Sequence, residues 1–256
     1  MFVMKKWSIM PLALVLGLGA LQAQDAGTDR FPHKMGNLHM SKSFANFDYL
    51  KDTEARTDTL LIYNAMDSSM KISFEKPPAY LICQVTPNPL PAGKEGMILI
   101  TYDAVAQGDY GFQNYRLGLR TNDAQQMIKT FSVRAYIEED FSKLTEEERQ
   151  NPPVMSIETE THDFGTVQEG TKVTYDFKFK NTGKRDLIIR KTKATCGCTA
   201  THPEKSLLKP GEESYFTVVF DTRGRTGPQH KSVFIYSNDP RHSTAAIHIK
   251  GNVLAP

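Results

Sequence analysis

The chain has 256 residues, of which 39% are hydrophobic and 23% charged, a composition typical of globular proteins with a packed core. Its formal net charge is +2 at pH 7, so charge gives no reason to expect nucleic acid or an anionic membrane surface as a partner. Three cysteines are too few for a disulfide-dense scaffold. In an oxidising compartment, an odd number leaves at least one thiol without a partner in the chain.

The N-terminal residues are typical of an export signal. Lys5 and Lys6 precede an apolar run from Trp7 to Leu21, and the small Ala23 stands before Gln24. A bilayer-spanning helix needs about 20 apolar residues, more than this run supplies. We therefore expect residues 1–23 to be a cleaved signal peptide. The mature chain is then periplasmic or secreted, soluble and without a transmembrane segment.

The segment after this cleavage site is expected to begin with a flexible stretch, residues 24–37, followed by a folded part, residues 38–137. Landmark residues of this part recur later in the chain at offsets of 116 to 118 residues. The matched pairs are Phe47 and Phe164, Asn64 and Asn181, Gly93 and Gly211, Asp103 and Asp221, and Thr121–Asp123 and Ser237–Asp239. An offset held this closely indicates two tandem copies of one fold. The first copy is degenerate, because it lacks the Cys-Gly-Cys of the second.

Residues 138–153 form the predicted linker. It is acidic, and Thr145 followed by Glu148 has the spacing of a capping box, which predicts a short helix over Glu146–Gln150. Pro152 and Pro153 are expected to end this helix and stiffen the entry to the next domain. Acidic runs of this size are typical of solvated spacers.

Residues 154–256 alternate apolar and polar side chains in short runs separated by turn residues, the pattern of antiparallel strands. Val173, Phe177 and Phe179 are expected to share one face of a strand. The following Asn181–Lys184 is a turn in which Gly183 can take a positive φ. About seven such strands in about 100 residues indicate an immunoglobulin-like sandwich. The fold prediction is therefore all-β, with two tandem immunoglobulin-like β-sandwiches joined by a short, partly helical linker.

Several short motifs occur together in this second copy: His162–Val167, Glu169-Gly170, Phe177–Gly183, Thr195–Thr199, Pro210–Glu212, Phe220-Asp221 and Ser237–Pro240. In this combination the segment resembles a bacterial exported family known as domain of unknown function 1573, related to Hydin-type and major-sperm-protein-like domains. The resemblance implies an immunoglobulin-like fold, an exported location and a binding or scaffolding role, with no established activity. One departure is the sequence Ala200–Pro203, where many relatives carry an acidic, tryptophan-containing loop.

The Cys196-Gly197-Cys198-Thr199 run is the most distinctive chemistry in the chain. Two thiolates suit Cu(I) or Zn(II), and His202 is a possible third ligand. A structural zinc site normally has four protein ligands, however.

Three other interpretations of these cysteines stay open. A Cys-x-Cys disulfide would close a tight, labile ring, and Lys191 and Lys193 nearby would lower a thiol pKa, which favours thiol–disulfide chemistry. A second interpretation is a link to Cys83 or to a partner protein. The third is that the two cysteines simply pack at the end of the sandwich.

The basic residues Arg190, Lys191, Lys193, Arg223 and Arg225 are expected to share a surface near that loop, where an acidic glycan or peptide could bind. No phosphate loop, Gly-x-Ser-x-Gly or dinucleotide motif occurs in the sequence. We therefore predict a non-catalytic binding or scaffolding protein of the cell envelope, without a required cofactor, whose partner is an envelope protein or a glycan. The alternatives are a copper- or zinc-binding protein and an envelope thiol–disulfide protein. The predicted contact residues are Cys196, Gly197, Cys198, Thr199, Arg223 and Arg225.

Overall fold

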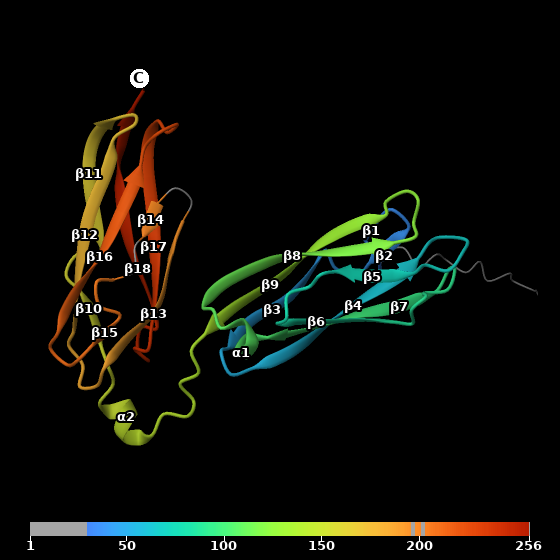
Figure 1. Ribbon diagram of the computed structural model, residues 1–256, viewed down its shortest axis with the longest axis horizontal. Coiled ribbons are helices and arrows are strands. Elements are labelled where there is room, and N and C mark those ends of the chain that lie inside the picture. The colour runs from blue at the N-terminus through green and yellow to red at the C-terminus, as the bar shows by residue number, and fades with distance from the viewer. Residues whose placement is uncertain (1–29, 196–197, 201–202, 256) are drawn as a thin grey trace, which may run out of the picture.

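The computed structural model describes residues 30–195, 198–200 and 203–255, whose regular secondary structure is almost entirely β-strand (Figure 1). The all-β prediction is confirmed. The predicted signal peptide, residues 1–23, lies outside the described residues. Within the described ranges, no helix is long and apolar enough to cross a membrane.

The first half of the chain forms two sheets that enclose one core. One sheet contains, in spatial order, β1 (His33–Met35), β2 (Leu38–Met40), β4 (Ala55–Asn64), β7 (Glu95–Asp103) and β6 (Leu81–Thr86). The other contains β3 (Phe44–Lys51), β9 (Ile128–Glu138), β8 (Gly111–Thr121) and β5 (Ile72–Glu75), and the short helix α1 (Ala104–Gln107) follows β7. The residues that alternate inward along these strands build the core, among them Leu60, Ile62, Ile98, Ile100 and Val133.

The start of this half differs from the expectation. The stretch 24–37 was expected to be flexible, yet its described residues include β1, which pairs with β2. Just before β1, the Phe31 side chain is buried, and its ring centroid lies 5.8 Å from that of Tyr63 on β4. Burial of a large aromatic side chain stabilises this segment on the sheet.

The second half forms two further sheets around a separate core. One contains β10 (Met155–Ile157), β12 (Lys172–Asn181), β16 (Glu213–Asp221) and β14 (Cys198–Ala200). The other contains β11 (Thr161–Gln168), β18 (Thr244–Leu254), β17 (Gly227–Ser237), β13 (Leu187–Ala194) and β15 (Leu207–Leu208). Val173, Phe177 and Phe179 all face this core, as their alternation predicts. The described part of this half has more strands than the expected seven. The additional ones are among β10, β14 and β15, which have only two or three residues each, too few for an alternating pattern to show in the sequence.

The two halves share one topology, which supports the internal repeat. The order β2-β4-β7-β6 corresponds to β10-β12-β16-β14, and β3-β9-β8-β5 corresponds to β11-β18-β17-β13. In both halves the first strand of the second sheet runs parallel to the last strand of that half, whereas the other strand pairs are antiparallel.

The repeated polar residues have a structural role. Asn64 and Asn181 are fully buried, and the Asn181 amide donates to the carbonyls of Arg185 and Leu208 at 2.8 and 2.9 Å. The Asn64 amide donates likewise to the carbonyls of Ser68 and Leu90. Asp123 and Asp239, also buried, each accept from two or more backbone N–H groups. Because buried backbone groups need partners, these side chains fix the loops at one end of each sandwich.

The linker is more ordered than a solvated spacer. The predicted helix is confirmed as α2 (Glu146–Gln150), with its capping box between Thr145 and Glu148. The Arg149 guanidinium donates to three preceding backbone carbonyls, and Arg185 of the second half pairs with Glu147 at 3.2 Å. The linker therefore lies against the second half.

The turn glycine at position 183 fits this packing in an unexpected way. It does not take a positive φ. A Cβ at Gly183 would instead collide with the backbone of Pro152 and Val154. The glycine is required because the linker approaches the turn closely.

Candidate functional site

The cysteine loop lies largely outside the described residues, which exclude Cys196, Gly197, Thr201 and His202. Cys198 and Thr199 begin β14, where their backbones pair with Phe220 and Val219 of β16. Within the part of the chain that the structure describes, β14 pairs only with β16 and lies at the edge of its sheet. Among the described residues, no group of three or more His, Cys, Asp or Glu side chains is placed to hold a metal ion. The metal and thiol–disulfide interpretations stay predictions.

The third cysteine, Cys83, lies in β6, the strand that corresponds to β14. It pairs with Ile100, and the repeat offset makes it the counterpart of Ala200 rather than of a cysteine. Its side chain packs against the first core, and burial raises the pKa of the thiol from 9.0 to about 11. At neutral pH this thiol is protonated, and the protonated form is a poor nucleophile and metal ligand.

The structure separates the five basic residues into two groups. Arg225 lies near β14, since its guanidinium is 5.6 Å from the ring of Phe220, the backbone partner of Cys198. Arg223 is engaged by Asp221, at 3.0 Å from Nε to Oδ1. The role of Arg223 and Arg225 as contact residues stays a prediction.

The other basic group turns toward the first half, so the prediction of one shared surface is wrong for these residues. Lys191 and Lys193 both pair with Asp109, which precedes β8, and Lys193 Nζ also donates to the Phe112 carbonyl at 3.2 Å. Arg190 forms a two-pronged pair with Glu139 of the linker, at 3.0 and 2.7 Å. The acidic groups that these cations meet belong to the same chain.

These contacts form a junction between the first half, the linker and the second half, and the Asp109 carboxylate is held there in its charged form. Burial by itself raises its pKa, but the hydrogen bond from Lys191, the N–H of Tyr110 and the charge of Lys193 together lower the pKa below its ordinary value. A partly buried carboxylate between two ammonium groups forms stronger ion pairs than one in water.

An aromatic contact accompanies the ion pairs. Gly111 has φ of +74°, and a Cβ there would collide with the hydroxyl of Tyr236 on β17. Tyr236 is buried, and this burial, with the hydrogen bond to Tyr136, raises the pKa of its phenol. Tyr136 also contacts Thr244, with 3.4 Å between the hydroxyl oxygens. The glycine thus permits one half to approach the other.

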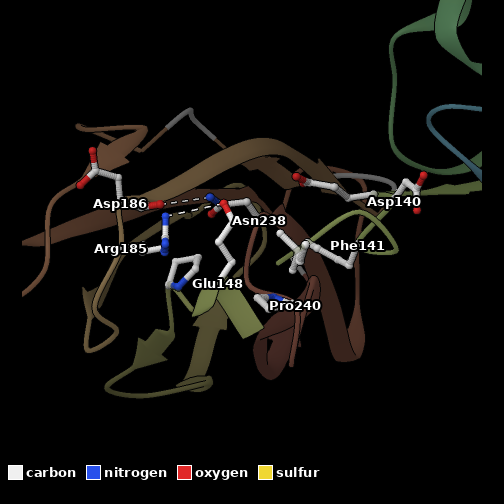
Figure 2. A pocket seen from close by; sticks show the side chains of 10 residues that line it. Asp140, Phe141, Glu148, Arg185, Asp186, Asn238 and Pro240 are labelled. Atoms are coloured by element: carbon white, nitrogen blue, oxygen red, sulfur yellow. Dashed lines mark hydrogen bonds and ion pairs between the residues drawn. The ribbon is translucent and has the colours of Figure 1, made fainter. Parts of the chain in front are cut away.

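A groove of about 490 Å³ lies where the linker meets the second half (Figure 2). Its polar groups are largely paired with one another: Asn238 donates to the Asp186 carbonyl at 3.0 Å, and Arg185 lies 3.6 Å from Glu148. Asn238 also accepts from the Ile188 N–H at 2.7 Å, so it fixes the loop before β13. This groove is explained by the docking of the linker.

A further surface, which no motif in the sequence indicates, lies on the outer face of β3, β9 and β8. Tyr49, Tyr136 and Phe112 form a row across these three strands, because Tyr136 pairs with Tyr49 on one side and with Phe112 on the other. Tyr49 is 64% and Phe112 57% exposed. The Tyr49 and Tyr136 rings lie 5.1 Å apart between centroids. With Phe44, which also lines a shallow groove of about 330 Å³, these rings are called the aromatic surface.

The second half has no aromatic side chain at the corresponding positions. Through the matching ladders of β11, β18 and β17, the counterparts of Phe44, Tyr49, Phe112 and Tyr136 are Thr161, Thr166, Pro228 and Asn252. One half therefore folds without these rings, so the sandwich does not require them. The available signal in the sequence was aromatic residues at outward positions of three strands, but no local pattern shows that the strands are neighbours.

Comparisons with known proteins agree with this architecture. A crystal structure of a protein of unknown function from Porphyromonas gingivalis W83 matches with a TM-score of 0.60 and 17% identity, over 85% of this chain and all of that one. This likeness shows the fold alone. A PapD-like domain of human CEP192 matches at a TM-score of 0.34 and 13% identity, over 46% of this chain and 97% of that one, which is too low to add to the argument. No curated protein matches the sequence. Residues 155–253 match the family model described as "Protein of unknown function (DUF1573)", the family that the motifs of the second half resemble.

Proposed function

We propose that this chain is an exported, non-catalytic binding or scaffolding protein of the bacterial cell envelope, and that the aromatic surface of its first half is a contact site. The observation that carries the proposal is the row of Tyr49, Tyr136 and Phe112, in which Tyr49 and Phe112 are exposed and Tyr136 between them is partly exposed. Exposed aromatic residues gathered on one surface are typical of binding sites, because they offer a large apolar area at a small cost in conformational entropy. Export is proposed from the signal-like N-terminus.

The junction between the halves supports a scaffolding role. Asp109 with its two lysines, Arg190 with Glu139, and Gly111 against Tyr236 all connect the first half or the linker to the second half. These contacts lie next to the aromatic surface, since Phe112 follows Gly111 in β8 and Tyr136 contacts Thr244. A ligand held on this surface would therefore be presented close to the second half.

The test is capture of partners from cell-envelope extracts with the purified mature chain. The variant Tyr49→Ser/Phe112→Ser is expected to lose most of what the wild type retains. The matched control is Ile82→Ser/Val105→Ser, because these apolar side chains of the same half are similarly exposed, at 53% and 63%, away from the aromatic row. Equal recovery by all three proteins would reject the aromatic surface as a contact.

The cysteine-loop contact is tested in the same experiment. The Cys196→Ala/Cys198→Ala variant removes both thiols without touching the first half. Reduced recovery would add the loop to the contact surface, whereas unchanged recovery would reject it.

A further inference from the structure

We infer that the aromatic surface binds uncharged carbohydrate, with sugar rings lying on the row of Tyr49, Tyr136 and Phe112. This inference rests on the proposed binding function and names the class of its ligand. A sugar ring has an apolar C–H face that packs on an aromatic ring and a rim of hydroxyl groups that need hydrogen-bond partners. Both requirements are met on this face of the sheet.

Beside the aromatic row lies a row of polar side chains. Asn46, Arg134 and Asn114 are paired across the same three strands, one step along the ladders from the aromatic row. A bulge in β3 between Asn46 and Tyr49 brings both side chains to the outer face, although they are three residues apart. Hydrogen-bonding groups therefore line one side of the rings.

The charges favour an uncharged, hydroxyl-rich ligand. The groove contains one cation, Arg134, and one anion, Asp48, so its side chains carry no net charge. The Arg134 guanidinium lies over the Phe44 ring at 4.4 Å from the centroid, and this cation–π contact keeps it beside the aromatic surface. Guanidinium and amide N–H groups donate hydrogen bonds, and the carboxylate and amide oxygens accept them. A sugar hydroxyl does both, whereas a charged ligand would leave one of the two ions uncompensated.

The size and shape of the site also suit a sugar. A groove of about 330 Å³ is at the small end of ligand sites, and it is shallow rather than enclosed. A stable protein interface, by contrast, needs about 800 Å² of surface from each partner. Three side chains in a row across adjacent strands span about 10 Å, from strand spacings of about 4.8 Å, which is the length of about two sugar rings.

The backbone conformation of Asp48 is a second, independent reason to expect a binding site here. It lies in the β3 bulge with φ of 47°, a left-handed conformation that glycine adopts most easily. Its counterpart in the second half is Gly165, with φ of +67° in the matching bulge of β11. The first half thus keeps a side chain where the fold favours none. The Asn46 amide donates to the Asp48 carboxylate and so orients it in the groove. A strained residue that supplies a polar group to a surface is typical of a functional site.

The first part of the test is an array of neutral hexose and N-acetylhexosamine oligosaccharides, with sialylated and sulfated versions beside them. The probe is the purified mature chain, and the strongest neutral oligosaccharide is then titrated by calorimetry. We expect neutral oligosaccharides to bind. Binding by none of them, or by the acidic versions alone, would overturn the inference.

Variants copied from the second half then locate the site. Tyr49→Thr installs the counterpart residue and is expected to weaken binding about tenfold, which is about 1.4 kcal/mol, because the ring that packs on the sugar face is lost. Asp48→Gly is expected to weaken binding severalfold while the melting temperature stays equal or rises, because glycine relieves the left-handed backbone. If Asp48 had only a structural role, the Asp48→Gly variant would bind as the wild type does. Val105→Ser is the control and should bind as the wild type does.

The result separates this inference from the proposed function. If no neutral oligosaccharide binds, but Tyr49→Ser/Phe112→Ser still loses protease-sensitive partners from envelope extracts, the surface is a protein contact and the carbohydrate inference is wrong. If the variant loses neither oligosaccharide binding nor protein partners, the aromatic surface is rejected as a contact site as well.

Discussion

The buried ion pair of the first half provides a stability test with an internal control. Lys129 and Asp123 are 0% and 1% exposed, and 2.9 Å separates their charged atoms. Asp123 also accepts from the backbone N–H and the side-chain amide of Asn37, at 2.8 and 2.9 Å, and from the N–H of Gln125. In the second half the corresponding Asp239 is also buried, but the counterpart of Lys129 is Ala245. A carboxylate at this position is therefore satisfied by N–H donors alone.

This comparison predicts that the two charges are not equivalent. Asp123→Asn leaves a buried ammonium without a counter-ion, which costs about 3–5 kcal/mol of stability. Lys129→Met leaves the carboxylate with its Asn37 and Gln125 donors, the arrangement found at Asp239, so we expect a cost of about 1–2 kcal/mol. The double variant should recover at least about 2 kcal/mol relative to Asp123→Asn alone.

Urea denaturation of the four proteins measures these differences. Equal losses from Asp123→Asn and Lys129→Met would refute the reasoning, because they would show that the carboxylate depends on the lysine. The pH dependence gives a second check. Burial raises the pKa of Asp123, but Lys129, Asn37 and Gln125 together lower it from 3.8 to about 2. The corresponding stabilisation, about 2 kcal/mol, is complete above pH 4 and is lost as the pH falls through 2.

Three further predictions concern the junction, the isolated cysteine and the repeated asparagine. Asp109→Asn leaves Lys191 and Lys193 without their carboxylate, so at low salt the radius of gyration measured by small-angle scattering should exceed that of the wild type. An equal radius would contradict the role of these ion pairs. Cys83 should be alkylated about 100-fold more slowly in the folded chain than a thiol of pKa 9.0, since its pKa is about 11, and mass spectrometry after iodoacetamide treatment at pH 8 measures this. Asn181→Ala removes two buried donors and the acceptor of the Gly183 N–H, and should cost about 2–3 kcal/mol in urea denaturation; a loss below 0.5 kcal/mol would contradict its structural role.

The sequence predicted the fold of each half because the relevant signals are local. Period-two alternation shows which side chains of a strand face inward, as for Val173, Phe177 and Phe179. Capping-box spacing likewise predicted α2, because the two residues that cap the helix are three positions apart. The recurring Asn64 and Asn181 revealed the repeat, since each satisfies nearby loop carbonyls that every copy of this fold must bury.

The candidate site, in contrast, was decided by tertiary structure. Lys191 and Lys193 were predicted to face an external anion, but strand pairing and the folded linker bring them to Asp109, about 80 residues earlier in the chain. Arg223 and Arg225, in contrast, follow β16 directly in the chain, so their place beside the end of that strand, the partner of β14, follows from the sequence alone.

By itself, then, the sequence determined the strand character, the repeat and the helix in the linker, because these depend on residues close together in the chain. Only the tertiary structure decided that Tyr49, Phe112 and Tyr136 form one row, since their strands become neighbours through long-range pairing. The bulge at Asp48 adds a second reason: one extra residue reverses the facing of all later side chains in β3. The alternation of side chains along a single strand carries no information about which strands pair or where a bulge lies.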